Sequence, residues 1–289
     1  MIKSIILIIA LSSIFLGFDR HKPAYVIYNE EGREVSYRRM MRAISGADIL
    51  LFGELHDNPI SHWLQYEVTN DLHGALDGRI MLAAEMFEAD NQLILDEYLR
   101  GLISESRFED EAKLWRNYRT DYKPLVEFAK ENSIPFIASN IPRRYANMVF
   151  RGGFEALEQL GSQALGYIAP LPVEYDPDLP GYSAMLEMSG GGMGHAGENL
   201  PKAQAIKDAT MAHFMLENHE PGRLLIHFHG TYHSDNFEGI YWYLTRRDPG
   251  LNIVTVSTTL QKETGTLDES AEGRANFIIV VPETMTRTY

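Results

Sequence analysis

The sequence predicts an α/β protein: a mostly parallel central sheet flanked by helices, with helical and loop insertions that cap the carboxyl edge of the sheet. Two observations predict this class. Short apolar runs, typical of strands buried on both faces, alternate along the chain with segments of helical periodicity. Acids, amides and histidines follow directly after these runs. Alternating strands and helices favour a parallel sheet, whose ligand sites lie beyond the carboxyl ends of the strands.

Residues 5–18 form an almost wholly apolar run after Lys3. As a helix, this run would span roughly 21 Å, short of the ~30 Å hydrocarbon core of a membrane. We interpret residues 1–18 as a secretory signal peptide, with an uncleaved anchor as the alternative, because no clear A-x-A cleavage site follows. Residues 19–289 are then expected to be a single exported domain, periplasmic or otherwise extracytoplasmic.

The apolar runs predict six strands, and the segments between them predict the helices. The expected strands cover residues 48–52, 79–86, 134–138, 223–229, 252–257 and 276–281. The expected helices cover residues 58–76, 89–100, 108–117, 124–131 and 203–219, and another begins at Pro142. Residues 101–125 and 140–200 are interpreted as insertions. Within the second insertion, the prolines and glycines of residues 167–200 predict long loops.

The composition excludes several classes of function. The 289-residue chain has a formal net charge of −14, so we expect no nucleic-acid partner. It contains no cysteine, which excludes disulfides, thiolate metal sites, a cysteine nucleophile and a lipid-modified cysteine. Any bound metal must therefore be held by histidine, carboxylate or tyrosine side chains.

Polar side chains follow four of the predicted strands, and we expect them to meet at one edge of the sheet. These candidates, in strand order, are Glu54 and His56, then Glu85, then Asn140 and Arg143, then His229 and His233. Three further residues are expected to support the site, namely His62, Gln204 and Asp208.

Each of these signals has a structural alternative. Glu54 and His56 suit either metal binding or water activation, but strand-end residues also bond to neighbouring loops. Glu85 lies within an apolar run, where a carboxylate is costly unless paired, and its alternative is an ion pair with Arg143 or Arg144.

The histidines also have alternatives. His62 faces the site or is an exposed first-turn residue. The trio His227, His229 and His233 either contributes to the site or consists of one core histidine and two surface ones.

The glycine-rich segment carries groups suited to a flat apolar cofactor. It combines thioether, phenol and imidazole side chains: Met185, Met188, Met193, Tyr182 and His195. A disordered insertion is the alternative. The aromatic cluster of Trp115, Tyr118 and Tyr122 is expected to cover the core of the first insertion.

These motifs together resemble those of the ChaN-type haem-binding proteins, which share a superfamily with Tiki proteases, pheromone-shutdown proteins and erythromycin esterases. The resemblance runs from about Asp48 to Val281 and rests on Gly53–His56, Asp57–Pro59, Glu85–Phe87, Asn140–Arg143, Ala203–Gln204 and Asp208–Ala212. It implies an exported haem-binding protein of haem-iron acquisition. It also implies tyrosine and histidine iron ligands, a homodimer around haem, and outer-membrane iron-uptake components as partners.

On this resemblance, Tyr182 and His195 are the candidate ligands, with Met185, Met188 and Met193 covering the macrocycle. The sequence departs from the family pattern in two places. Many members are lipoproteins, whereas this chain has no cysteine to acylate. The family's last strand usually ends in a glycine-rich turn with one histidine, whereas residues 227–233 contain three.

Two functions are therefore expected, and a haem-binding protein is favoured. The alternative is a hydrolase, either a peptidase or an esterase, with catalytic groups drawn from Glu54, His56, Glu85, His229 and His233. In its metal-dependent form, zinc or manganese would be held by His56, Glu85, His229 and His233.

Overall fold

The computed structural model describes residues 22–189 and 195–289. The signal peptide or anchor expected over residues 1–18 lies outside the described residues, as do Met193 and the side chains of Met188 and His195. Within the described residues, no helix has the length and apolar character needed to cross a membrane.

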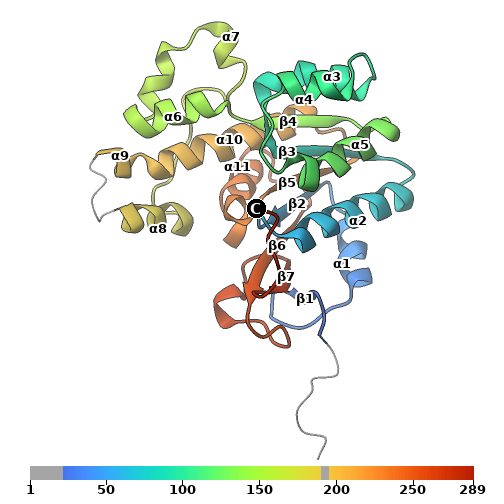
Figure 1. Ribbon diagram of the computed structural model, residues 1–289. Coiled ribbons are helices and arrows are strands. Elements are labelled where there is room, and N and C mark those ends of the chain that lie inside the picture. Colours follow the sequence, from blue (N-terminus) through green and yellow to red (C-terminus); the bar gives the residue numbers. More distant parts are fainter. Residues whose placement is uncertain (1–21, 190–194) are drawn as a thin grey trace, which may run out of the picture.

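In the described part of the chain, a seven-stranded sheet forms the centre of the molecule (Figure 1). Its strands are β1 (Val26–Asn29), β2 (Ile49–Glu54), β3 (Ile80–Glu88), β4 (Phe136–Asn140), β5 (Leu224–Gly230), β6 (Ile253–Gln261) and β7 (Phe277–Pro282). The order is β1-β7-β6-β2-β5-β3-β4, and only the edge pair β1–β7 is antiparallel. The mostly parallel sheet expected from the sequence is confirmed. The short strand β1 was not expected.

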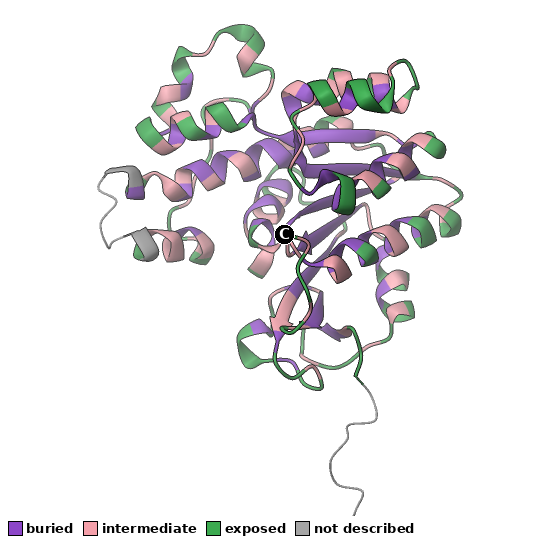
Figure 2. Cartoon of the chain, in the orientation of Figure 1, coloured by how far each residue is buried: buried purple, intermediate pink, exposed green. Residues whose placement is uncertain are grey.

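Helices cover both faces of this sheet, because side chains along each strand alternate between two cores. Leu50 and Phe52 of β2 pack in one core, whereas Ile49 and Leu51 pack in the other. The first core is covered by α1 (Tyr37–Ile44), α2 (Pro59–Ala75), α3 (Gln92–Leu99), α4 (Glu105–Glu111) and α5 (Lys123–Glu131). The second is covered by α6 (Arg143–Gly152), α10 (Leu200–Asn218) and α11 (Ile240–Arg247). Figure 2 shows the result as a buried sheet inside helices with exposed outer faces.

Two segments differ from their predictions. The helix expected over residues 108–117 is instead α4, which begins after the N-cap Ser104 and ends where Ala112 becomes extended. A π-helical turn then follows at Tyr118–Tyr122. Residues 167–200 contain loops, as expected, but also α8 (Pro180–Ser189) and α9 (His195–Glu198). The short helix α7 (Ser162–Leu165) precedes them.

Candidate functional site

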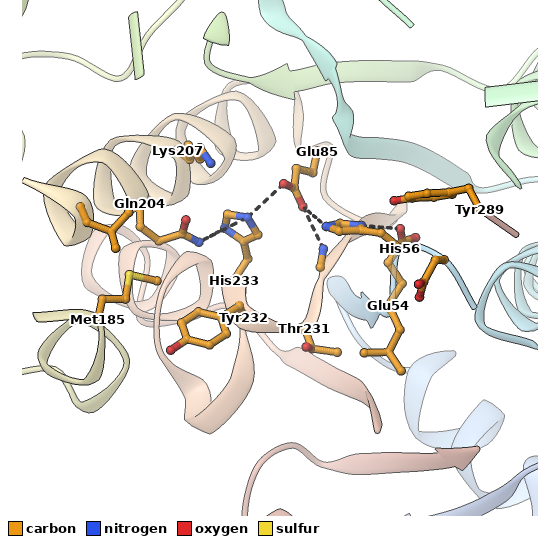
Figure 3. A pocket seen from close by; sticks show the side chains of 14 residues that line it. Glu54, His56, Glu85, Met185, Gln204, Lys207, Thr231, Tyr232, His233 and Tyr289 are labelled. Carbon is orange, nitrogen blue, oxygen red and sulfur yellow. Dashed lines mark hydrogen bonds and ion pairs between the residues drawn. The ribbon is translucent and has the colours of Figure 1, made fainter. Parts of the chain in front are cut away.

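A cavity of about 660 Å³ lies beyond the carboxyl ends of β2, β3 and β5 (Figure 3). Its volume is within the ~300–1,000 Å³ typical of small-molecule sites. The cavity is lined by Glu54, Leu55, His56, Asp57, Glu85, Met185, Leu200, Gln204, Lys207, Gly230, Thr231, Tyr232, His233 and Tyr289. Glu54, His56, Glu85 and His233, predicted from three different strand ends, are thus brought together.

Glu54 ends β2 and is only 1% exposed. Its Oε1 accepts hydrogen bonds from His56 Nδ1 at 2.8 Å and from the Tyr122 hydroxyl at 2.7 Å. Its Oε2 accepts a hydrogen bond from Gln65 Nε2 at 2.5 Å and lies 3.6 Å from His62 Nδ1. Imidazole, phenol and amide groups therefore satisfy this buried carboxylate, and among the described residues it forms no ion pair with lysine or arginine.

His56 lies between two carboxylates and is the accessible imidazole of the cavity, with 34% of its side chain exposed. Nδ1 contacts Glu54, and Nε2 lies 4.0 Å from Glu85 Oε2. Burial acts to lower the pKa of His56, but the hydrogen bond to Glu54 and the charges of Glu85 and Glu54 outweigh it and raise the pKa. A Cβ atom at Gly230 would lie 2.7 Å from Nε2, so any larger residue there would displace the His56 ring.

Glu85 is held by Gly230 and His233, at and after the end of β5. Its Oε2 accepts a hydrogen bond from the backbone N–H of Gly230 at 2.8 Å, and its Oε1 lies 3.1 Å from His233 Nε2. Burial alone would raise the pKa of Glu85, but the charge of His233 and its hydrogen bond hold it well below its usual range. Asn140, at the end of β4, donates to the backbone oxygen of Glu85 at 2.9 Å and so supports the site from below.

The suggested ion pair between Glu85 and an arginine is wrong. Arg143 begins α6 and is exposed, and Arg144 pairs with Asp90 at 2.5 Å. Both arginines are exposed in the first turn of α6, and the partner of Glu85 is instead His233, which follows β5. Arg143 therefore does not join the candidate site.

His233 is a buried cation between two carboxylates. Its Nε2 faces Glu85, and its Nδ1 is hydrogen-bonded to Asp208 of α10. Burial acts to lower the pKa of His233, but the charges of Glu85 and Asp208 raise it to about 9. The ring is therefore protonated at neutral pH, with one N–H for each carboxylate. The amide nitrogen of Gln204 lies 2.9 Å from Nδ1, so the structure places Gln204 and Asp208, both of α10, next to His233.

His227 and His229 belong to a separate hydrogen-bond chain beneath the cavity. Ser139 donates to the backbone oxygen of Ala84 at 3.0 Å, so its hydroxyl oxygen accepts from His227 Nε2–H at 2.8 Å. His227 Nδ1 must then accept from His229 Nδ1–H at 3.0 Å, and His229 Nε2 accepts from the Ser234 hydroxyl at 2.8 Å. Each ring is thus assigned one neutral tautomer.

The pKa values of these two rings agree with that assignment. Burial lowers the pKa of His227 to about 3, and burial together with the charges of His227 and His233 places that of His229 well below its usual range. All three histidines of residues 227–233 are buried, so the alternative of one core and two surface histidines is wrong. The exposed alternative for His62 is also wrong, because His62 is 7% exposed.

The structure gives no support to the metal alternative. Among the described residues, no three His, Asp or Glu side chains are grouped so that they could hold a metal ion. Three of the four predicted ligands, His229, Glu85 and His233, already have hydrogen-bond or ion-pair partners. Ser234 occupies His229 Nε2, Gly230 and His233 occupy the oxygens of Glu85, and the two nitrogens of His233 face carboxylates.

The residues predicted from the glycine-rich segment divide into two groups. Met185 of α8 lines the cavity. Tyr182 of the same helix is 4% exposed, does not line the cavity, and donates its hydroxyl to Asp208 Oδ2 at 2.7 Å. Tyr182 thus supports the carboxylate that holds His233.

Several functional residues were missed by sequence reasoning. Gln65 carries a usable signal, because it lies three residues after His62 on the same helical face. Tyr122 was assigned to the insertion core, but its hydroxyl reaches Glu54 because the π-helical turn packs against α2. Lys207, Tyr232 and Tyr289 carry no local signal, since only the tertiary fold places them on the cavity wall.

Residues 287–289, here called the strap, bring Tyr289 to the cavity wall beside His56 (Figure 3). Arg287 pairs with Asp57 at 3.1 Å, and the Thr288 N–H donates to the Asp57 backbone oxygen at 2.9 Å. The Thr288 hydroxyl donates to the buried Asp121 at 2.8 Å, and Tyr289 lines the cavity. The strap therefore contributes Tyr289 to the cavity wall near the carboxyl end of β2.

The fold and the cavity together define a class: an α/β protein with a cavity at the carboxyl edge of a mostly parallel sheet. Residues 40–244 match the family described as haem-binding uptake, Tiki superfamily, ChaN. The chain belongs to this family, as its sequence motifs indicated.

Solved structures share the fold. The ChaN protein of Campylobacter jejuni, described with cofacial haem binding, is 18% identical with a TM-score of 0.68, and the match covers 89% of this chain and 96% of that one. A succinoglycan biosynthesis protein is 11% identical with a TM-score of 0.51, covering 85% of this chain and 90% of that one. Identities this low show the fold alone. No curated protein matches the chain.

Proposed function

We propose that this protein binds haem in the cavity at the carboxyl edge of its sheet. The observation that carries the proposal is membership of the haem-binding uptake family over residues 40–244, which span the site from Glu54 to His233. The cavity supports it, because its walls combine aromatic and apolar side chains with an imidazole. These walls include Tyr232, Tyr289, Met185 and Leu200.

The residues of the cavity fit this ligand. Haem iron is commonly held by histidine or tyrosine. Tyr232 is 51% exposed on the cavity wall, and His56 is the accessible imidazole. Tyr182 would first have to give up its hydrogen bond to Asp208. We therefore propose Tyr232 and His56 as iron ligands ahead of Tyr182, with His195 as a further candidate from α9. Bound haem would supply a ferric centre as cargo for transport.

Four wider properties accompany this proposal. We propose that the protein is exported, on the apolar run of residues 5–18, and that it serves haem-iron acquisition. A homodimer around haem and a partnership with outer-membrane iron-uptake components follow from the family resemblance. Fractionation of cells that express the full chain tests export, and sedimentation with and without haemin tests the dimer.

Titration of the purified protein with haemin tests haem binding. We expect a shifted Soret band that saturates, because a phenolate or imidazole replaces solvent at the iron. Tyr232→Phe and His56→Gln should change the position of the band, whereas Tyr182→Phe serves as the matched phenol control. A wild-type protein that leaves the haemin spectrum unchanged contradicts the proposal.

A second candidate function is metal-free, Glu/His-assisted hydrolysis. The specific observation that favours it is the 2.8 Å contact between Glu54 Oε1 and His56 Nδ1, since a carboxylate that orients an imidazole prepares the other nitrogen as a general base. In this reaction His56 Nε2 would take a proton from water that attacks an ester or amide carbonyl. Protonated His233 and the Gly230 N–H lie nearby on Glu85.

An ester and peptide panel tests this second function. His56→Gln should abolish any hydrolysis that the wild-type protein performs in the presence of a chelator. His73→Gln, on α2 away from the cavity lining, is the control. Hydrolysis that survives in His56→Gln would contradict this assignment of the base.

A further inference from the structure

Lys207 has an unusual place among the basic residues of this acidic chain. It lies on α10, and among the described residues it is the one lysine or arginine side chain that lines the cavity. Gln204, one helical turn earlier, lines the same wall. Figure 3 shows these two side chains on one side of the cavity and Glu54, His56 and Tyr289 on the other.

The ammonium group of Lys207 has no counter-ion in the described part of the chain, where no carboxylate lies within 4.0 Å of it. Lys113 and Lys123, by contrast, both pair with glutamates. The neighbouring Asp208 does not fill this role, because its carboxylate bonds to His233 and Tyr182. Burial raises the pKa of Asp208, and the charge of Lys207 is the smallest of the influences that oppose this.

The opposite side of the cavity is acidic. Glu54 lines it, Glu85 lies between His56 and His233, and Asp57, also in the lining, pairs with Arg287 of the strap. An anionic group of a ligand would be repelled there, and the chain as a whole carries a net charge of −14. Protonated His233 also lines the cavity, but both of its nitrogens already face carboxylates. The half-buried side chain of Lys207 therefore carries the cationic group of the described cavity lining that remains able to form a charge-assisted hydrogen bond to a ligand carboxylate.

We propose that Lys207 binds a carboxylate of the ligand and so fixes its orientation in the cavity. This inference rests on the proposed haem binding and deepens it, because for haem the carboxylate is a propionate. With a propionate at Lys207, the other lining residues, among them Tyr232, Met185 and His56, would be left to hold the rest of the ligand. Lys207 is a specificity-determining residue, since it distinguishes a porphyrin with free carboxylates from one without.

Paired titrations with haemin and haemin dimethyl ester, both delivered in the same detergent, test this role. The ester keeps the iron and the macrocycle but has no charged propionate. Lys207→Met keeps the length of the side chain and removes its charge. Lys202→Met is the matched control, because Lys202 is a half-buried lysine of the same helix that does not line the cavity.

We expect Lys207→Met to weaken haemin binding about tenfold or more, as expected for a lost charge-assisted hydrogen bond, and to leave binding of the ester unchanged. Added salt should weaken haemin binding more in the wild-type protein than in Lys207→Met. Lys202→Met should behave as wild type in both titrations.

The outcomes separate this inference from the function on which it rests. If the wild-type protein binds haemin but Lys207→Met binds it equally well, or loses affinity for both porphyrins alike, the role of Lys207 is overturned and haem binding stands. If the wild-type protein binds neither porphyrin, the proposed function is overturned, and this inference with it.

Discussion

Two pairs of histidines lie within one edge of the sheet, yet the structure gives them opposite electrical states. His56 and His233 contact carboxylates, and their pKa values are raised. His227 and His229 contact hydroxyl groups and each other, and their pKa values are lowered. His227, His229 and His233 are equally buried. Burial therefore does not decide the charge of these rings; the chemical nature of their partners does.

The charged and the neutral histidines also occupy different places relative to the cavity. The carboxylate-bound pair lines the cavity, whereas the neutral pair forms a chain from Ser139 to Ser234 beneath it. The four predictions that follow test this contrast, from the largest expected effect to the smallest.

Removal of the charged ring should have the largest effect. His233→Ala leaves Glu85 and Asp208 buried without their shared cation, and we expect the free energy of unfolding to fall by about 3–5 kcal/mol. Urea unfolding measures this change. His213→Ala, a half-buried histidine of α10, is the control and should cost less than about 1 kcal/mol. Equal losses of unfolding free energy in the two variants would show that Glu85 and Asp208 do not depend on a cationic His233.

The two kinds of histidine should also give opposite pH dependence. The folded pKa of His233, about 9, is above the unfolded value of 6.5, so its stabilisation is complete below pH 6.5 and is lost as the pH rises through 9. The folded pKa of His227, about 3, is below 6.5, so its contribution is present above pH 6.5 and is lost as the pH falls towards 3.

Urea unfolding between pH 4 and pH 10 measures these slopes. The wild-type protein should lose, between pH 6.5 and pH 9.5, of the order of 3 kcal/mol more than His233→Gln. His227→Gln should instead remove part of the loss on the acidic side. Identical profiles on the alkaline side for wild type and His233→Gln would refute the raised pKa.

Ser139→Ala tests the hydrogen-bond chain that contains the neutral rings of His227 and His229. It leaves the buried His227 Nε2–H without an acceptor, and we expect a loss of about 1–3 kcal/mol. The matched control is Ser45→Ala at the end of α1, where the hydroxyl is partly exposed to water and the change should stay within about 0.5 kcal/mol. If Ser139→Ala loses no more free energy of unfolding than Ser45→Ala, the hydrogen bond between Ser139 and His227 does not contribute as described.

The smallest effect is expected at Tyr122. Tyr122→Phe removes one hydrogen-bond donor from Glu54, so the carboxylate attracts protonated His56 more strongly and the pKa of His56 rises further. The change should correspond to about 0.5–1 kcal/mol. An NMR titration of the imidazole signal measures it, with Tyr118→Phe as the control. A lowered pKa in Tyr122→Phe would contradict this account.

The sequence predicted most of what positions the site, because the strands carry strong local patterns. The buried runs of β2, β3 and β5 and the polar residues after them identified Glu54, His56, Glu85 and His233. It did not predict the four-residue β1, since an edge strand that short has no distinctive pattern. Nor did it predict the partners: Tyr122 and His233 meet their carboxylates across 68 and 148 residues, which only tertiary packing decides.

The strap has a consequence for how the cavity opens. Arg287 meets Asp57 across 230 residues at the surface, and residues 287–289 pack in neither hydrophobic core, although the Thr288 hydroxyl bonds to the buried Asp121. Segments held in this way detach in local fluctuations that leave the sheet intact. Hydrogen exchange should therefore be fast at the Thr288 amide, which donates to Asp57, and slow at Ile226 in the middle of β5. Release of the strap would move Tyr289 away from the cavity wall while the sheet stays folded.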